Sequence, residues 1–356
     1  MVGPDGVLAL PWLEQPLRAA LRTRRAHALL VHGPSGVGQF ELALALAQAW
    51  LCETPEPPAT QPRPCGVCGG CRLVQSRSHP DLLVILPETL RESLGWANDV
   101  QGEDAAADRA GKAKPSKEIK VDVVRTVVAF AQTTSARGRG KVVVMHPAER
   151  MNAVAANTLL KTLEEPAGDA RFVLSSAAPD ALLPTIRSRC QALPLVTPAP
   201  EQALAWLAGK GVDRPEVLLG ATGGQPLEAL DWAQQGLEAE LWLRLPQLVA
   251  GGESAALANW PLPRLINALQ KLSHDALCTV VGATPRYFPA SSLGRGASLP
   301  ALLEWTRSLA RAARHAEHPW QPALMTESLL QQARVALLPT GSADRGKPVD
   351  SLHSST

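Results

Sequence analysis

The sequence has 356 residues, of which 46% are hydrophobic and 19% are charged, and its formal net charge is +2. This length favours two or three domains over a single core, and the composition is typical of a globular protein. The near balance of charge excludes a global positive field, so any contact with DNA has to come from a local patch or from partners. The sequence has neither an apolar stretch long enough to cross a bilayer nor a signal-like start, so we expect no membrane contact and a cytoplasmic location.

The first half of the chain alternates between strand and helix patterns. An apolar run at 27–31 precedes a glycine-rich turn at 33–38, and apolar residues then recur at helical spacing over 39–51. Further strands are predicted at 81–86, 141–145 and 172–176, and further helices at 122–132 and 151–165. This alternation predicts an α/β fold whose mainly parallel sheet is covered by helices on both faces.

The pattern changes near residue 198, where Pro198 and Pro200 mark a boundary. Beyond it apolar residues recur at helical spacing and strand-like runs disappear, which predicts an all-helical second half. Two polar segments stand apart from these elements. Residues 87–118 are predicted to form a flexible surface loop, and the Ser-, Gly-, Lys- and Asp-rich residues 340–356 a disordered tail.

The glycine-rich turn has the spacing of a P-loop, G-x-x-x-x-G-K-[ST], between a predicted strand and a predicted helix. Gly33 and Gly38 fit this pattern, but Gln39 and Phe40 replace the Lys and the hydroxyl residue. Gln cannot place positive charge on the phosphates, and Phe cannot coordinate Mg²⁺. A turn unrelated to a P-loop is the alternative, which the strand–loop–helix context disfavours. These four residues predict a degenerate loop without productive ATP binding, although its N–H groups could still hold an anion weakly.

The strand that should supply a metal-binding acid is degenerate as well. The predicted strand at 142–145 ends in His146 and Pro147, where an ATPase carries an acid for Mg²⁺ and usually a second acid that polarises water. Glu149 lies past the end of this strand. The combined loss predicts that the chain does not hydrolyse ATP on its own.

Four of the six cysteines are concentrated in one short stretch. Cys52, Cys65, Cys68 and Cys71 have gaps of twelve, two and two residues. Short gaps let thiolates converge on one ion, and four protein ligands leave no open position, so the pattern predicts a structural zinc site. A redox pair, an iron–sulfur cluster and His79 as a substitute ligand are less favoured alternatives. The isolated Cys190 and Cys278 are predicted to be buried thiols.

Several of these features occur together in one known family. The sequence resembles the delta-prime subunits of bacterial DNA polymerase III clamp loaders, which are AAA+ proteins. The resemblance lies in the run 27–33, the degenerate loop, the cysteine cluster, the segment NTLLKTLEEP at 157–166 and Ser188-Arg189-Cys190, in this order. The resemblance covers about residues 8–200 and weakens through the helical half. It implies an AAA+ domain at 1–197 with the zinc insert at 52–71, a small helical lid at 198–240 and a helical collar for oligomerisation at 241–339.

The resemblance also implies a role and a set of partners. Such a subunit is a non-hydrolysing stator in a hetero-pentamer with delta and with the gamma or tau subunits that hydrolyse ATP. The complex loads a sliding clamp onto primer–template DNA and is part of the DNA-directed DNA polymerase holoenzyme, a nucleotidyltransferase.

Individual positions carry implications as well. Arg189 would be an arginine finger acting on a neighbour's ATP, and Arg187 is a less favoured candidate. Without the resemblance, the sequence predicts only that both are surface arginines at the end of a helix. Leu227 replaces an Arg that senses nucleotide in catalytic relatives, whereas Ser176 keeps the hydroxyl of a sensor Thr.

Two other functions compete with this interpretation. The chain could be an active gamma- or tau-like ATPase, which Gln39 and His146 disfavour. It could also be a zinc-dependent nucleic-acid-binding protein. The near-neutral charge and a cysteine segment poor in Lys and aromatic residues disfavour that alternative.

Overall fold

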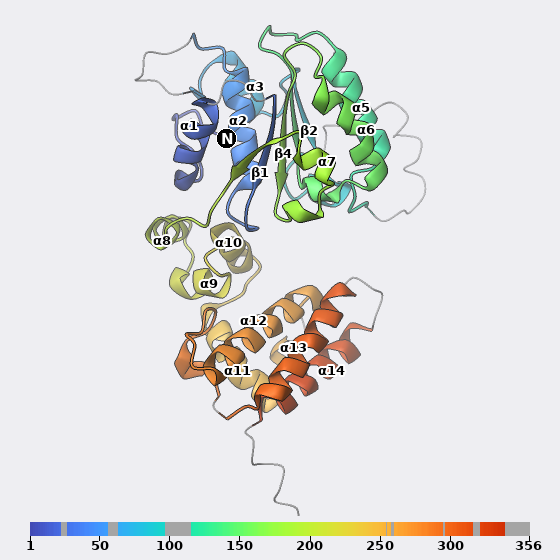
Figure 1. Ribbon diagram of the computed structural model, residues 1–356. Coiled ribbons are helices and arrows are strands. Elements are labelled where there is room, and N and C mark those ends of the chain that lie inside the picture. The colour runs from blue at the N-terminus through green and yellow to red at the C-terminus, as the bar shows by residue number, and fades with distance from the viewer. Residues whose placement is uncertain are drawn as a thin grey trace, which may run out of the picture. The chain divides into compact units, whose positions relative to one another are not determined.

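The computed structural model describes residues 1–22, 27–55, 63–96, 115–253, 255–257, 260–294, 296–315 and 321–338. The chain divides into two compact units, Met1–Trp206 and Leu207–Thr356. The first unit holds a parallel sheet and the second is built from helices (Figure 1). The predicted fold class is therefore confirmed, while the finer division into a lid and a collar remains a prediction.

The sheet of the first unit has the strand order β2-β3-β4-β1-β5, and every neighbouring pair is parallel. Its strands are β1 (Ala28–His32), β2 (Leu82–Ile85), β3 (Val142–Met145), β4 (Arg171–Ser176) and β5 (Gln191–Pro194). The central strands are buried on both faces, as apolar runs such as Val142–Met145 predict. Because all strands run the same way, the loop after β1 and the ends of β3 and β4 meet at the carboxyl edge of the sheet.

Helices cover both faces of this sheet (Figure 1). The helices of the unit are α1 (Glu14–Arg22), α2 (Gln39–Leu51), α3 (Gly69–Gln75), α4 (Glu88–Arg91), α5 (Val121–Gln132), α6 (Ala153–Glu164) and α7 (Pro184–Arg187). The α5 and α6 helices pack on one face, where Val127 and Leu159 join a core with Met145 and Phe172. The α2 helix packs against β3 and β4 on the other face. Burial of these apolar faces is the main force that holds the layers together.

The α6 helix is fixed at both ends by its sequence. The Asn152 side chain accepts a hydrogen bond from the Ala155 N–H at 2.9 Å, which satisfies one of the free donors of the first turn. Pro166 follows the helix closely and cannot continue it. Leu159 and Leu163 are fully buried, so the carboxyl end of α6 is anchored to the core.

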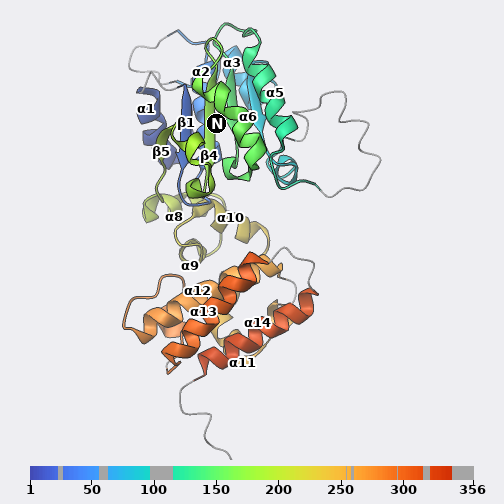
Figure 2. The same ribbon diagram turned by 45° about the vertical axis from the view of Figure 1, so that its right-hand side comes forward.

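The second unit is helical throughout its described part. Its helices are α9 (Pro215–Ala221), α10 (Pro226–Gln234), α11 (Ala239–Gly251), α12 (Leu262–Val280), α13 (Leu299–Arg314) and α14 (Pro322–Leu337), and α8 (Pro200–Gly209) spans the point where the units divide. The α12, α13 and α14 helices pack on one another, and α11 packs on α14 (Figure 2). The buried Asp275 carboxylate accepts the N–H groups of Arg286, Tyr287 and Phe288, which fixes the segment after α12.

Several expectations are corrected by the structure. Residues 69–75 of the cysteine-rich stretch form α3, a helix that was not predicted. The segment 87–118 begins with α4 and a buried Trp96 rather than with flexible loop. Its residues 97–114 and the predicted tail at 340–356 lie outside the described residues. Neither α1 nor β5 was predicted. Among the helices the structure describes, none is long and apolar enough to cross a membrane.

Candidate functional site

The glycine-rich loop joins β1 to α2 at the carboxyl edge of the sheet. A Cβ atom on Gly33 would lie 2.0 Å from the Leu195 carbonyl oxygen, so only glycine fits there. Gly38 precedes α2 with φ +104°, a conformation that favours glycine. The Trp12 indole donates to the Val37 carbonyl at 2.8 Å, so the N-terminal segment packs against the loop. The backbone context of a P-loop is thus present.

The Gln39 side chain turns back onto this loop. Its amide Nε2 donates to the carbonyl oxygens of Gly33 at 2.8 Å and Pro34 at 2.5 Å, and the residue is 5% exposed. A P-loop Lys at this position would extend to the phosphates of the nucleotide. The loop therefore has a neutral amide bound to its own backbone where a cation would be needed.

An aromatic pair occupies the neighbouring position. The Phe40 ring is stacked on the His146 imidazole with centroids 4.8 Å apart and planes 24° apart. His146 Nδ1 is 2.9 Å from the Ser175 hydroxyl of β4. Glu149, the nearest acid after β3, accepts the Ala177 N–H at 3.0 Å. Neither ring carries an oxygen atom, which is the ligand that Mg²⁺ prefers.

Burial controls the charge of His146. It lowers the pKa of His146 to about 4, and the nearby Glu149 carboxylate opposes this only partly. The imidazole is therefore neutral at pH 7 and stacks on Phe40 as an uncharged ring.

We expect this histidine to make the fold acid-sensitive. The unfolded chain binds the proton at the ordinary pKa. The contribution of neutral His146 to the free energy of unfolding is therefore fully present above about pH 6.5 and is lost as the pH falls towards 4. The full difference corresponds to about 3 kcal/mol. Urea unfolding at pH 7.5 and pH 4.5 measures it, with His146→Phe as the control that keeps a ring without a titrating group. An equal loss of stability in both proteins would assign the acid sensitivity to other groups.

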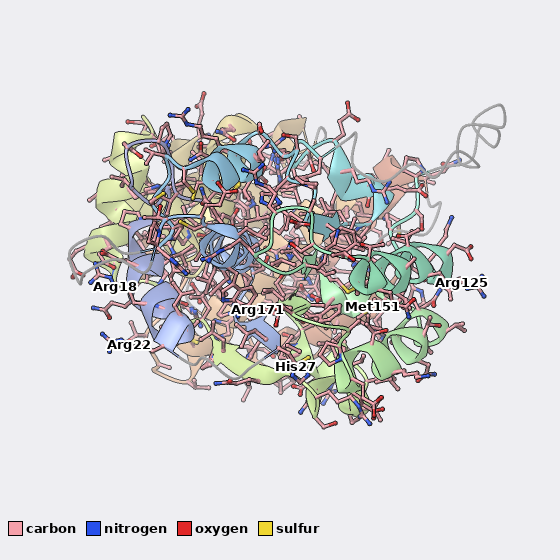
Figure 3. The ribbon with its side chains drawn as sticks, turned by 90° about the horizontal axis from the view of Figure 1, so that it is seen from above. Arg18, Arg22, His27, Arg125, Met151 and Arg171 are labelled. Carbon is pink, nitrogen blue, oxygen red and sulfur yellow. The ribbon has the colours of Figure 1, made fainter. Side chains whose placement is uncertain are left out.

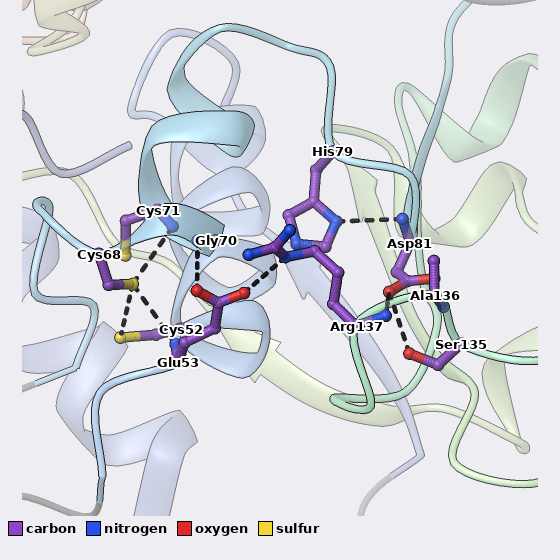
Figure 4. Close-up of polar contacts among 10 residues, drawn as sticks. All are labelled: Cys52, Glu53, Cys68, Gly70, Cys71, His79, Asp81, Ser135, Ala136 and Arg137. Atoms are coloured by element: carbon purple, nitrogen blue, oxygen red, sulfur yellow. Dashed lines mark hydrogen bonds and ion pairs between the residues drawn. The ribbon is translucent and has the colours of Figure 1, made fainter.

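The four cysteines of the insert come together at the end of α2. Figure 4 shows three of them, Cys52, Cys68 and Cys71. Their sulfur atoms all lie within 4.8 Å of one another, with Cys65–Cys71 at 3.9 Å and Cys52–Cys68 at 3.8 Å. A tetrahedron with metal–sulfur bonds of about 2.3 Å has sulfur–sulfur edges of about 3.8 Å. The cluster therefore fits a four-coordinate ion such as zinc.

Backbone donors surround these sulfurs. The N–H groups of Glu53 and Cys71 point to Cys68 Sγ, and the Cys68 N–H points to Cys65 Sγ, each at 3.4 Å. Such contacts stabilise thiolate charge and orient metal ligands. The hydrogen bond from Cys71 lowers the pKa of Cys52 to about 4. His79 is not among the residues whose ligand atoms converge in this cluster, and its Nδ1 accepts the Asp81 N–H at 3.0 Å.

A polar network links the cysteine insert to the loop before β3 (Figure 4). Glu53 accepts the Gly70 N–H at 3.0 Å and Arg137 Nε at 2.5 Å. The buried Asp81 in turn accepts the N–H groups of Ala136 and Arg137 and pairs with Lys141 at 3.2 Å. Burial opposes ionisation of Asp81, but these donors hold its pKa below the ordinary value. The sequence alone gave no signal for this link, because its members are far apart along the chain.

Arg189 lies between α7 and β5 and is bound by a carboxylate from α6. Its Nε donates to Glu164 Oε1 at 2.6 Å, Nη2 contacts the same oxygen, and Nη1 donates to the Thr185 carbonyl at 2.8 Å. Arg187 is more exposed and pairs with Asp180 at 2.8 Å. Because Arg189 precedes β5, whereas the glycine loop follows the parallel β1, the two lie at opposite edges of the sheet. Arg189 is thus at the far edge from the chain's own loop.

The two isolated cysteines, the sensor-like Ser176 and Leu227 were also singled out in the sequence. Cys190 and Cys278 are only half-buried rather than buried, because both lie near element ends where solvent reaches them. Burial still raises the pKa of Cys190 to about 12. Ser176 is fully buried and accepts the Ala178 N–H at 3.1 Å, so its hydroxyl serves the local turn. Leu227 lies in the first turn of α10.

Comparisons with known proteins agree on one family. The family model described as "DNA polymerase III, delta subunit" matches residues 13–199, more than half of the chain. The chain belongs to the delta-prime family of DNA polymerase III subunits. The "DNA polymerase III subunit delta'" of Escherichia coli is 32% identical over 282 residues, 75% of each chain. Its namesake from Pseudomonas aeruginosa is 39% identical over 238 residues, 65% of this chain and 63% of the relative's own length.

The chain is also similar to part of a tau subunit. The "DNA polymerase III subunit tau" of Escherichia coli is 33% identical over 164 residues, which is 46% of this chain and 20% of tau. This chain and tau therefore share sequence over a part of their length.

Proposed function

We propose that the chain is a non-hydrolysing stator subunit of the DNA polymerase III clamp loader. One observation carries this proposal: side chains of the chain itself occupy the positions where a P-loop ATPase has its lysine and its Mg²⁺ ligands. The Gln39 amide binds the Gly33 and Pro34 carbonyls, and the Phe40–His146 stack takes the place of the Mg²⁺ ligands. A loop without a cation or a metal ligand cannot stabilise the charge that develops in phosphoryl transfer.

The family supplies the partners in this proposal. The chain would assemble in the cytoplasm with delta and with gamma or tau subunits in a hetero-pentamer. It would reach the sliding clamp and primer–template DNA through that complex, as a component of the DNA-directed DNA polymerase holoenzyme. Its similarity to tau supports assembly with related subunits.

Arg189 is the residue we propose to act on a neighbour's ATP. A guanidinium is a permanent cation whose planar fork of donors matches phosphate oxygens. Its position at the opposite edge of the sheet from Gly33–Gly38 supports action in trans, since the strand between them spans roughly 15 Å. Arg187 is less suited, because its partner Asp180 is 94% exposed and holds the side chain less rigidly than Glu164 of α6 holds Arg189.

We further propose that the four cysteines hold a structural zinc ion. Four thiolate ligands leave no coordination position for water or substrate, so the ion would stabilise the insert and take no part in a reaction. The same four sulfurs at tetrahedral spacing disfavour a redox pair, which needs only two.

An active gamma- or tau-like ATPase is the alternative function. The sequence similarity to tau favours it. Gln39 at the lysine position and His146 at the acid position directly after β3 argue against it, because both phosphate and metal would lack their ligands.

A turnover assay separates the two functions. We expect the isolated chain to release no phosphate from Mg-ATP above the blank, with or without primed DNA. The variant Gln39→Lys/Phe40→Thr restores the P-loop signature but should also be inactive, because no acid replaces His146. Sustained turnover by the isolated wild-type chain would support the ATPase alternative instead.

A further inference from the structure

The guanidinium of Arg189 is bound in a way that leaves one edge open. Guanidinium carries five N–H donors. Glu164 takes the edge formed by Nε and Nη2, and the Thr185 carbonyl takes one donor of Nη1. The remaining contact, from Nη1 to Ser188 Oγ, is at the 3.4 Å limit of a hydrogen bond. The distal edge, with one N–H from each terminal nitrogen, is the edge that binds phosphate bidentately.

This open edge borders a shallow hollow of about 400 Å³ lined by His27, Leu163, Glu164, Ser188 and Arg189. The hollow brings together the start of β1, the end of α6 and the segment after α7. His27 Nε2 is 2.7 Å from the Leu163 carbonyl and so ties β1 to the last turn of α6. The His27 side chain is labelled in the view from above (Figure 3). An anion reaching Arg189 would approach through this hollow.

Glu164 is well placed to fix the orientation of Arg189. It is the last residue of α6, directly after the fully buried Leu163, so its backbone is anchored in the core. A long Arg side chain is otherwise free to rotate, and ordering it costs conformational entropy. A carboxylate on a rigid helix removes that cost before the phosphate arrives, which is the general benefit of preorganisation.

We propose that Glu164 is a positioning residue for Arg189: it binds the Nε edge of the guanidinium so that the distal edge faces the phosphate of a neighbouring subunit's ATP. This inference rests on the proposed role of Arg189 as an arginine finger. Glu164 does not touch the nucleotide itself and acts only through Arg189.

The test uses clamp-loader complexes reconstituted with variants of this chain. Glu164→Ala is expected to lower kcat for ATP at the adjacent site by about 10- to 100-fold, with KM changed less than about twofold, because misorientation acts on the reacting geometry. Glu164→Gln keeps an acceptor oxygen and should lose less. Glu165→Ala removes the same charge one residue along, from an exposed position, and should match the wild type.

A double variant distinguishes positioning from independent effects. Glu164→Ala combined with Arg189→Ala should be no slower than Arg189→Ala alone, because Glu164 acts through that side chain. Unchanged or faster hydrolysis in both Glu164 variants, with Arg189→Ala still slow, would overturn the positioning role and leave the finger intact. Wild-type hydrolysis in Arg189→Ala would instead overturn the finger, and this inference with it.

Discussion

Replacement of Arg189 by alanine is expected to lower ATP hydrolysis at the neighbouring subunit's site by about 10³-fold or more. The guanidinium would contact the phosphate only as charge develops in the transition state, so its loss acts on kcat rather than on assembly. The fold should tolerate the change. The Arg189–Glu164 pair is partly exposed, and such pairs contribute at most about 1 kcal/mol.

Single-turnover hydrolysis by the reconstituted complex measures this effect, and size-exclusion chromatography checks that the variant assembles. Arg187→Ala is the matched control, since Arg187 lies two residues away and pairs with Asp180. It should hydrolyse ATP like the wild type. A slow Arg187→Ala complex beside an unaffected Arg189→Ala complex would move the finger to Arg187.

Loss of the metal is expected to have the second large effect. In the Cys68→Ser variant the proposed zinc site loses one thiolate, and the zinc content should fall from one ion per chain to near zero. Structural zinc in small domains contributes about 10–16 kcal/mol of apparent binding free energy. The insert should therefore lose its local structure.

Mass spectrometry of the metal content and hydrogen exchange measure the two parts of this prediction. Exchange should rise at 63–75, and also at 135–137, because Glu53 connects the insert to Arg137. Cys190→Ser is the matched control, since Cys190 lies in the same unit and belongs to neither group of side chains that could hold a metal ion. Full zinc content in the Cys68→Ser protein would remove Cys68 from the ligand set, and a wild-type protein without zinc would contradict the proposed zinc site.

The parts of the fold that depend on local patterns could be predicted from the sequence. The strands β1 to β4 are apolar runs, and the α2, α5 and α6 helices have apolar residues at helical spacing. In contrast, β5 at Gln191–Pro194 is a mostly exposed edge strand, so its residues give no buried-strand signal. The α3 helix was missed because glycine and cysteine dominate its start.

In the candidate site, too, residue types could be predicted from the sequence, whereas contacts between distant residues could not. The residue types at Gln39, Phe40 and His146 already predicted a site without charge or metal ligands. The sequence could not show that the Gln39 amide binds the loop's own carbonyls, because this depends on a side-chain orientation fixed by packing. Glu164 belongs to the NTLLKTLEEP segment, yet its contact with Arg189 joins residues 25 positions apart. Only the packing of α6 beside α7 brings them together.

Binding of magnesium nucleotide to the purified chain tests the central claim most directly. Calorimetric titration with Mg-ATP or a non-hydrolysable analogue is expected to give no heat of binding at concentrations up to about 1 mM. The loop lacks its cation, and Gln39 already binds the carbonyls of the cradle. Saturable, magnesium-dependent binding with a micromolar Kd would contradict the account.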